Sequence, residues 1–303
     1  MQYIKRIFFF LLTNIAVLAL LSVVMSIVNL YFPNLIQANG WVGRLLIYAL
    51  VLGFGGSFIS LLISRWSAKK AYNIILIDSQ SASSNIKLQS VWQTVERIAQ
   101  AHNITMPEVG YYESAEPNAF ATGSSKNRSL LAVSSGLLEQ MEKNEIEGVV
   151  GHEMAHILNG DMVTLTLIQG VLNTFVIVLT HLATRAVVAA LARNDNDGET
   201  IGYFAHFWIS MIFQIIFWLL ASVVIMWFSR IREYRADLGG AQFTSKSHMI
   251  AGLKRLQKMT AVDTHHTDTK MTAFMINEPD GWFSTHPSLT NRIKALEENY
   301  QLA

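Results

Sequence analysis

The sequence contains no cysteine, and charged residues occupy only 15% of its 303 positions. The absence of cysteine excludes disulfides, thiolate metal sites and cysteine nucleophiles. Soluble proteins typically carry about 25% charged residues, whereas hydrophobic residues here reach 51%. This imbalance predicts that much of the chain lies in lipid. Because the net charge is only +1, no basic surplus indicates a nucleic-acid partner.

Four apolar runs are long enough to cross a bilayer, which requires about 20 residues. They extend over roughly 7–32, 41–63, 162–192 and 201–228. The first run is longer than the apolar core of about 7–15 residues in a secretory signal, and no small-x-small cleavage pattern follows it. The sequence therefore predicts four retained transmembrane helices.

The basic residues that flank these runs are distributed unequally between the two sides of the membrane. One side carries eight of them, namely Lys5, Arg6, Arg65, Lys69, Lys70, Arg230, Arg232 and Arg235. The other side carries three, namely Arg44, Arg185 and Arg193. Positive charge marks the cytoplasmic side. We therefore expect both termini and the 65–161 and 229–303 segments in the cytoplasm, and the 33–40 and 193–200 loops outside.

The predicted organisation has four segments that alternate between lipid and water. A pair of transmembrane helices occupies 1–64, a first cytoplasmic part 65–161, a transmembrane hairpin 162–228, and a second cytoplasmic part 229–303. Neither cytoplasmic part is expected to fold as a stable domain by itself, so we expect the two to pack together. The predicted fold is a mainly α membrane protein with one cytoplasmic α+β domain.

Within the cytoplasmic parts, local patterns predict several elements. Apolar residues recur at helical spacing over Leu88–Ala101. Aromatic and branched residues predict short strands over Glu108–Tyr112 and Leu130–Val133. Pro117–Thr122 is interpreted as an edge strand that follows a proline, and the 260–281 stretch as a loop.

A further helix is predicted from Glu145 to Leu158. Asn144 and Glu147 resemble an N-cap and its N3 partner, and Asn159-Gly160 supplies a stop signal. This helix contains the one pattern in the chain that is typical of a catalytic metal site.

The pattern is His152-Glu153-Met154-Ala155-His156. Residues four apart lie on the same face of a helix, so both imidazoles can reach one ion and supply two of the three protein ligands of a catalytic zinc. Glu153 lies beside them and can take a proton from water. Three fixed positions of this kind arise by chance in roughly a few per cent of chains of this length, and the alternative is a solvated histidine pair.

A catalytic zinc needs a third ligand, commonly His or Glu. No third histidine follows at the metzincin spacing, but the chain leaves the inner surface after Asp161 and returns after the hairpin at Ser229. Glu233 would then re-enter near His156, and Asp237 one turn later could accept a hydrogen bond from a ligand histidine. The alternative for Glu233 is a charged residue in an arginine-rich flank.

These motifs resemble the HtpX-type family of integral-membrane zinc proteases, which is related to the CAAX prenyl proteases and has a gluzincin active site. The resemblance covers essentially the whole chain. It implies a zincin-like domain with one Zn²⁺ held by His152, His156 and Glu233. It also implies that Glu153 is the catalytic base and that Asp237 supports a ligand histidine.

The Pro117–Ala121 segment resembles the edge strand with which this family grips the substrate backbone. The resemblance implies that Asn118, Ala119 and Phe120 bind substrate. Taken alone, these residues fit a structural strand, although an open strand edge can pair with an extended peptide.

The Ser284–Ser288 segment, together with Arg292, resembles the part of the family that stabilises the transition state. The resemblance implies catalytic roles for His286 and Arg292. Taken alone, they fit a surface histidine and a solvated helix residue.

The resemblance implies an endopeptidase of the bacterial inner membrane that cleaves misfolded or damaged membrane proteins and unfolded proteins on the cytoplasmic side, in quality control under stress. Its partners would be polypeptides and the lipid bilayer, and no oligomeric state is predicted. Two alternatives stay open. An intramembrane protease would carry the histidines inside an apolar span, which Glu142, Lys143 and Asp161 disfavour. A zinc-dependent adaptor would have an inactive site, which the intact Glu153 disfavours.

Overall fold

The computed structural model describes residues 40–83, 85–194, 203–263 and 286–299, together with part of 15–31. Most of the predicted first span and of the 33–40 and 193–200 loops lies outside the described residues. The predicted loop over 260–281 is wrong at its start, because a helix continues to Asp263. The rest of that stretch also lies outside the described residues.

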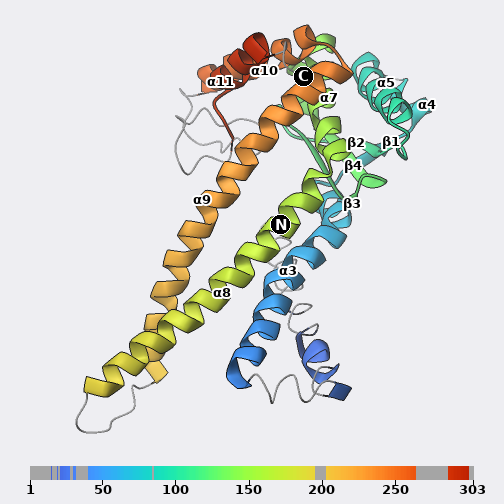
Figure 1. Cartoon of the computed structure of the whole chain (residues 1–303). Helices are drawn as coiled ribbons and strands as arrows, with labels where there is room; N and C mark the ends of the chain where they lie inside the picture. Colours follow the sequence, from blue (N-terminus) through green and yellow to red (C-terminus); the bar gives the residue numbers. More distant parts are fainter. Residues whose placement is uncertain are drawn as a thin grey trace. The chain divides into compact units, whose positions relative to one another are not determined.

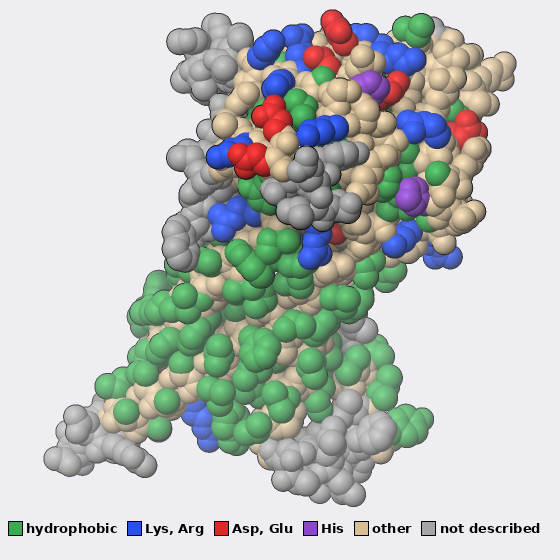
Figure 2. All heavy atoms as spheres, turned by 45° about the horizontal axis from the view of Figure 1, so that its top comes forward, with side chains coloured by type: hydrophobic (Ala, Val, Ile, Leu, Met, Phe, Trp, Pro, Cys, Tyr) green, Lys and Arg blue, Asp and Glu red, His purple; other side chains and the backbone are tan. Residues whose placement is uncertain are grey.

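The chain forms two compact units (Figure 1). Apart from the first two residues, one unit contains 3–60 and 165–225, and we call it the helical unit. The other contains 61–164 and 226–303, and we call it the mixed unit because it holds the sheet. On the face shown in Figure 2, hydrophobic side chains cover the long helices, whereas charged side chains gather over the mixed unit.

Three helices among the described residues are long and apolar enough to cross a membrane. They are α3 (Gly40–Tyr72), α8 (Asp161–Asn194) and α9 (Tyr203–Phe243). They confirm helices at the second, third and fourth apolar runs, and each extends beyond its run. Within the helical unit a Cβ added at Gly53 would collide with Thr174, whose hydroxyl donates to the Ala49 carbonyl at 3.3 Å. Such close approach through small residues is typical of helix packing in lipid.

The mixed unit contains a four-stranded sheet with strand order β1-β2-β4-β3. The strands are β1 (Ile75–Ile77), β2 (Glu108–Tyr112), β3 (Ala119–Ser125) and β4 (Arg128–Ser134). β2 runs parallel to β4, and the other pairs are antiparallel. The predictions of β2, β4 and an edge strand at β3 are confirmed, whereas the three residues of β1 are too short to carry a pattern.

Six helices complete the described part of the mixed unit. They are α4 (Ser79–Ala82), α5 (Ile86–Ala101), α6 (Ser135–Gln140), α7 (Lys143–Asn159), α10 (Lys246–Asp263) and α11 (Leu289–Asn299). α5 confirms the helix predicted from apolar spacing, because Val91, Val95 and Ile98 are buried in the core. α7 packs against α5, α10 and β3, so it is the central helix of this unit.

The predicted start of α7 is wrong by two residues. The N-cap is Glu142, whose N–H donates to the Glu145 carboxylate at 2.9 Å in a capping box. Glu147 is turned instead toward the core side, where it accepts from Ser90 at 3.2 Å and lies 3.2 Å from His248. These tertiary contacts outweigh the local cap that the sequence predicts. The stop at Gly160 is confirmed, with a left-handed φ of 68°.

Glycines allow α7 to approach its neighbours closely. A Cβ at Gly148 would collide with the His248 carbonyl of α10, and one at Gly151 would lie 3.1 Å from the Gly240 carbonyl of α9. The two backbones therefore pack almost directly on α7. This packing places a side chain of α9 within reach of the α7 histidines.

Candidate metal centre

The two histidines of α7 point the same ring nitrogen at a common position. Their Nε2 atoms lie 3.1 Å apart. The Glu233 carboxylate of α9 lies 3.4 Å from each of these nitrogens, through Oε2 to His152 and through Oε1 to His156. These three residues form a group whose donor atoms could hold one metal ion.

The spacing of the donors fits zinc. Zinc bonds to imidazole nitrogen and carboxylate oxygen at about 2.0–2.2 Å, and in a tetrahedron this places ligand atoms about 3.3–3.6 Å apart. The separations of 3.1, 3.4 and 3.4 Å are close to this range. Three protein ligands leave a fourth tetrahedral position, which is the arrangement of catalytic rather than structural zinc sites.

Each histidine is oriented by its own carboxylate on the opposite ring nitrogen. The Nδ1 of His152 lies 2.9 Å from Asp237 Oδ1, and the Nδ1 of His156 lies 2.6 Å from Asp161 Oδ2. An Nδ1–H that donates to a carboxylate leaves the Nε2 lone pair facing the metal position. Asp237 therefore occupies the place that the sequence predicts for it.

Sequence reasoning missed Asp161 as the partner of His156. It is the first residue of α8, and it follows the left-handed Gly160 that ends α7. This tight turn brings the Asp161 carboxylate back into contact with the His156 ring. An acidic residue directly after the predicted glycine stop was the available signal.

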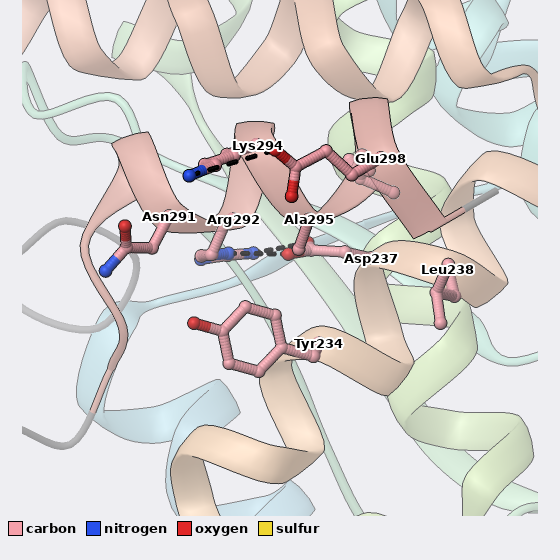
Figure 3. Close-up of a pocket in the computed structure, with 9 residues that line it drawn as sticks. Tyr234, Asp237, Leu238, Asn291, Arg292, Lys294, Ala295 and Glu298 are labelled. Carbon is pink, nitrogen blue, oxygen red and sulfur yellow. Dashed lines mark hydrogen bonds and ion pairs between the residues drawn. The ribbon is translucent and has the colours of Figure 1, made fainter.

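Arg292 of α11 contacts both Asp237, the partner of His152 (Figure 3), and the carboxylate of Glu233. Its Nε and Nη2 donate to the two Asp237 oxygens at 2.7 and 2.6 Å, and its Nη1 lies 3.5 Å from Glu233 Oε2. The side chain is completely buried. A two-pronged, buried contact of this kind holds both carboxylates in fixed positions.

A pocket of about 230 Å³ opens onto the metal position. Its lining includes Glu153, Phe120 and His286, and the Nδ1 of His286 lies 3.3 Å from Glu233 Oε2. Ala119 also lines the pocket, whereas Asn118 does not. The Asn118 backbone is instead fixed to Ser134, by an N–H donated at 2.9 Å and a carbonyl that accepts at 2.8 Å.

Arg292 does not line the pocket that Glu153 and His286 share. The proposed roles of Asn118, Ala119, Phe120, His286 and Arg292 stay predictions. The geometry brings all of them except Asn118 and Arg292 to the pocket surface.

The surroundings of the site shift the pKa values of two α7 residues. Burial raises the pKa of the Glu153 carboxyl, and the two neighbouring imidazoles offset part of this rise. Burial lowers the pKa of the His156 imidazole, but hydrogen bonds to Asp161 and Glu233 outweigh it and raise that pKa to about 9. A carboxylate with a raised pKa accepts a proton more readily, as a general base must.

Two imidazoles and a carboxylate that could hold one metal ion, with an adjacent glutamate of raised pKa, in a chain with long apolar helices, are the arrangement of a membrane-bound metallopeptidase. Residues 85–300 match the model of peptidase family M48, and the chain belongs to this family.

Curated relatives match along nearly the whole chain. "Protease HtpX" of Tolumonas auensis is 46% identical over 297 residues, which cover 97% of this chain and 99% of the relative. "Protease HtpX homolog" of Neisseria gonorrhoeae strain NCCP11945 is 47% identical over 295 residues, and "Protease HtpX" of Shewanella oneidensis 45% over 296, with the same coverage. These matches confirm the resemblance inferred from the motifs.

The crystal structure of S. mikatae Ste24p has a similar fold, with a TM-score of 0.60 and 14% identity. The match covers 90% of this chain and 64% of that chain, so this chain spans less than two thirds of the length of the S. mikatae protein. At this level of identity the likeness concerns the fold.

Proposed function

We propose that this protein is a zinc-dependent endopeptidase of the bacterial inner membrane, with its catalytic domain in the cytoplasm. Its substrates would be misfolded or damaged membrane proteins and unfolded proteins, cleaved in quality control under stress. The observation that carries the proposal is the triad of His152, His156 and Glu233, whose donor separations match zinc coordination. The Lewis acidity of one zinc ion held there would acidify water and polarise a scissile carbonyl.

The residues around the triad would carry the proton and orient the peptide. Glu153 lines the pocket beside both imidazoles, and it takes the proton of the attacking water and passes it to the leaving amine. His286 lies at the same pocket and donates toward the developing oxyanion, a contact typically worth about 10²–10³ in rate. Arg292 acts through Asp237 and Glu233, as a positioning residue, rather than by contact with the substrate.

The edge of the sheet would hold the substrate in an extended conformation. β3 is the last strand in the order β1-β2-β4-β3, so one side of it has no strand partner among the described residues. The backbone of Ala121 in this strand lies close enough to Glu153 to lower the pKa of its carboxyl slightly, so the strand is next to the proposed catalytic base. Ala119 and Phe120 line the pocket beside it. Backbone pairing with this edge would tolerate many substrate sequences.

The proposed topology retains four spans, with segments 1–64 and 162–228 in lipid and 65–161 and 229–303 in the cytoplasm. Of the described helices, α3, α8 and α9 are apolar enough to span, and α7 is not among them. This supports a metal site outside the hydrocarbon core, rather than an intramembrane protease.

The proposal is tested with full-length protein in detergent and an unfolded model protein as substrate. Glu153→Gln keeps the three metal ligands, so we expect stoichiometric zinc and a loss of cleavage of about 10²–10⁴-fold. Glu233→Ala should lose zinc and cleavage together.

The matched control is Glu139→Gln, which removes an exposed carboxylate of α6 and should cleave like the wild type. Chelation should abolish wild-type cleavage and added zinc should restore it. Undiminished cleavage by a clean Glu153→Gln preparation would exclude Glu153 as the base.

A further inference from the structure

The last turns of α3 pack on the face of the sheet that is turned away from α7. Val109, Leu131 and Val133 belong to the hydrophobic core that α7 also enters. Successive residues of a strand point to opposite faces of the sheet. Glu108 and Tyr112 of β2 therefore point to the other face, where they meet the end of α3.

Two kinds of contact join α3 to this face of β2. The Nζ of Lys69 and the Nη1 of Arg65 lie 2.7 and 3.6 Å from Glu108 Oε2. The centroid of the Tyr72 ring lies 5.2 Å from that of Tyr112. Arg65, Lys69 and Tyr72 follow one another at steps of four and three residues, so they share one face of the helix. This face of α3 is therefore docked along β2.

Phe120 of β3 joins the same contact from the edge of the sheet. The centroid of its ring lies 5.3 Å from that of Tyr72 and 5.8 Å from that of Tyr112. The rings meet across β4 because Phe120 is in register with Ala132, whose side chain is a single methyl group. All three separations are in the range of about 4.5–7 Å in which aromatic pairs attract. We call Tyr72, Tyr112 and Phe120 the aromatic cluster.

The cluster holds the part of β3 that lies next to the metal position. Among the described residues β3 pairs with one strand, β4, and the register of this pairing shifts between Gly123 and Ser125. The other edge has to stay open if a substrate strand is to pair with it. Ala119, Phe120 and Ala121 come before the shift and line the pocket at the metal position. The ring contacts of Phe120 therefore fix this part of β3 without covering its open edge.

We propose that Tyr72 is a positioning residue of the peptidase site. It does not line the pocket at the metal position. It acts through Phe120, whose ring it holds against the sheet, and so keeps the edge of β3 where an extended substrate pairs. This role rests on the proposed endopeptidase function. Loss of the Tyr72 ring should weaken substrate binding and leave the chemical step and the metal ligands unchanged.

The experiment measures KM and kcat for an unfolded model protein with full-length protein in detergent. Tyr72→Ala removes two ring contacts, so we expect KM to rise about 5–10-fold, toward the upper end of what an aromatic pair contributes. The kcat and the bound zinc should stay within about twofold of the wild type, as expected when binding is lost equally from the ground state and the transition state. Tyr72→Phe keeps the ring and should keep the wild-type KM.

Glu108→Gln is the matched control, because it removes the ion pairs of α3 on β2 and leaves the aromatic cluster intact. It should keep the wild-type KM. A double-mutant cycle with Phe120→Ala isolates the ring contact, and Tyr72→Ala should raise KM no further in that background. An equal rise of KM in Glu108→Gln and Tyr72→Ala, additive effects in the cycle, or an unchanged KM in Tyr72→Ala would overturn the proposal.

Hydrogen exchange of the backbone amides gives a measurement that does not depend on cleavage. Local contacts limit the opening from which amides exchange, so the amides of β3 should exchange several-fold faster in Tyr72→Ala, whereas those of α7 should not change. Unchanged exchange in β3 would refute the positioning role whether or not the protein cleaves. Faster exchange in β3, in a protein whose wild type cleaves nothing, would refute the proposed function and leave the contact of Tyr72 with β3 standing.

Discussion

At the scale of single residues, the two imidazoles of the metal centre depend on carboxylates from two different helices. Asp237 comes from α9 and is itself held by Arg292, whereas Asp161 opens α8 directly after α7 ends. The histidine pair is thus oriented by the helices that carry the chain into and out of the apolar hairpin. Loss of either carboxylate should make the orientation of its histidine less fixed, although all three proposed ligands are still present in the chain.

Asp161→Asn tests this dependence at His156. The change keeps the shape of the side chain but removes the negative charge that strengthens the hydrogen bond from Nδ1. Partners of this kind typically contribute about 10–100-fold to metal affinity, so we expect zinc affinity to fall by that factor in a chelator competition. Glu139→Gln removes a charge from the exposed surface and serves as the control. Wild-type zinc affinity in Asp161→Asn would show that the 2.6 Å contact does not orient the ligand.

Residues whose positions follow from spacing could be placed together from the sequence. The pairing of His152 and His156 follows from the helical repeat. The return of Glu233 to their side follows from the prediction of a transmembrane hairpin. Asp161 could not be assigned in this way, because its role depends on the turn at Gly160 rather than on a repeat. The cap of α7 was misplaced for a related reason, since Glu147 is drawn away by Ser90.

At the scale of elements, α7 is held between helices through backbone contacts. Gly148 faces the backbone of α10, and Gly151 faces that of α9. Close contact through glycine leaves no flexible side chain to absorb a change. The position of the histidines therefore depends on these glycines as much as on the ligands.

Gly148→Ala and Gly252→Ala form a matched pair that tests this packing. A Cβ at Gly148 would collide with the His248 carbonyl, whereas one at Gly252 would lie 3.1 Å from the Glu145 carbonyl. Overpacking of the first kind typically costs about 1–3 kcal/mol, while alanine in a helix recovers about 0.5–1 kcal/mol. We expect a clearly lower melting temperature for Gly148→Ala and little change for Gly252→Ala. Equal melting temperatures would contradict the packing of α7 on α10.

The elements themselves were predicted unevenly. α5, β2 and β4 were found because their apolar residues repeat with the period of a helix or the composition of a strand. β1 was not predicted because its three residues are too few to establish a period. The end of α10 at Asp263 was assigned to a loop because the histidines, proline and glycine of the 260–281 stretch predicted a loop from its first residue, whereas the helix continues into that stretch.

At the scale of the whole molecule, the complete lack of cysteine makes the proposed orientation directly testable. A cysteine introduced at any position becomes the sole thiol of the chain. Lys258→Cys lies on an exposed position of α10, and Asp197→Cys lies in the loop predicted to face outward.

A membrane-impermeant maleimide should label Asp197→Cys in cells with a permeabilised outer membrane, and Lys258→Cys only after the inner membrane is broken. The physical reason is that the basic flanks would keep the 229–303 segment in the cytoplasm in the proposed topology. The unmodified chain provides the blank. The reverse pattern would invert the proposed topology, and labelling of both positions before lysis would refute the single span predicted between them over 201–228.

Composition and hydropathy predicted a lipid-embedded part and a separate mixed part, because the apolar runs are long and their flanks are charged. The sequence did not reveal that the helices continue beyond the runs. α9 extends from Tyr203 to Phe243, well past the apolar stretch, because its later residues are buried by α7 rather than by lipid.

This continuity restricts how the sequence can change over generations. Between the apolar run and Glu233 the helix has no break, so inserting or deleting one residue would turn the carboxylate by about 100° and shift it by about 1.5 Å. Such a change would carry it out of the ring of donors altogether. Variation in this stretch can therefore proceed by substitution, whereas changes of length should be tolerated in the stretch between α8 and α9, which the sequence predicts to be a loop.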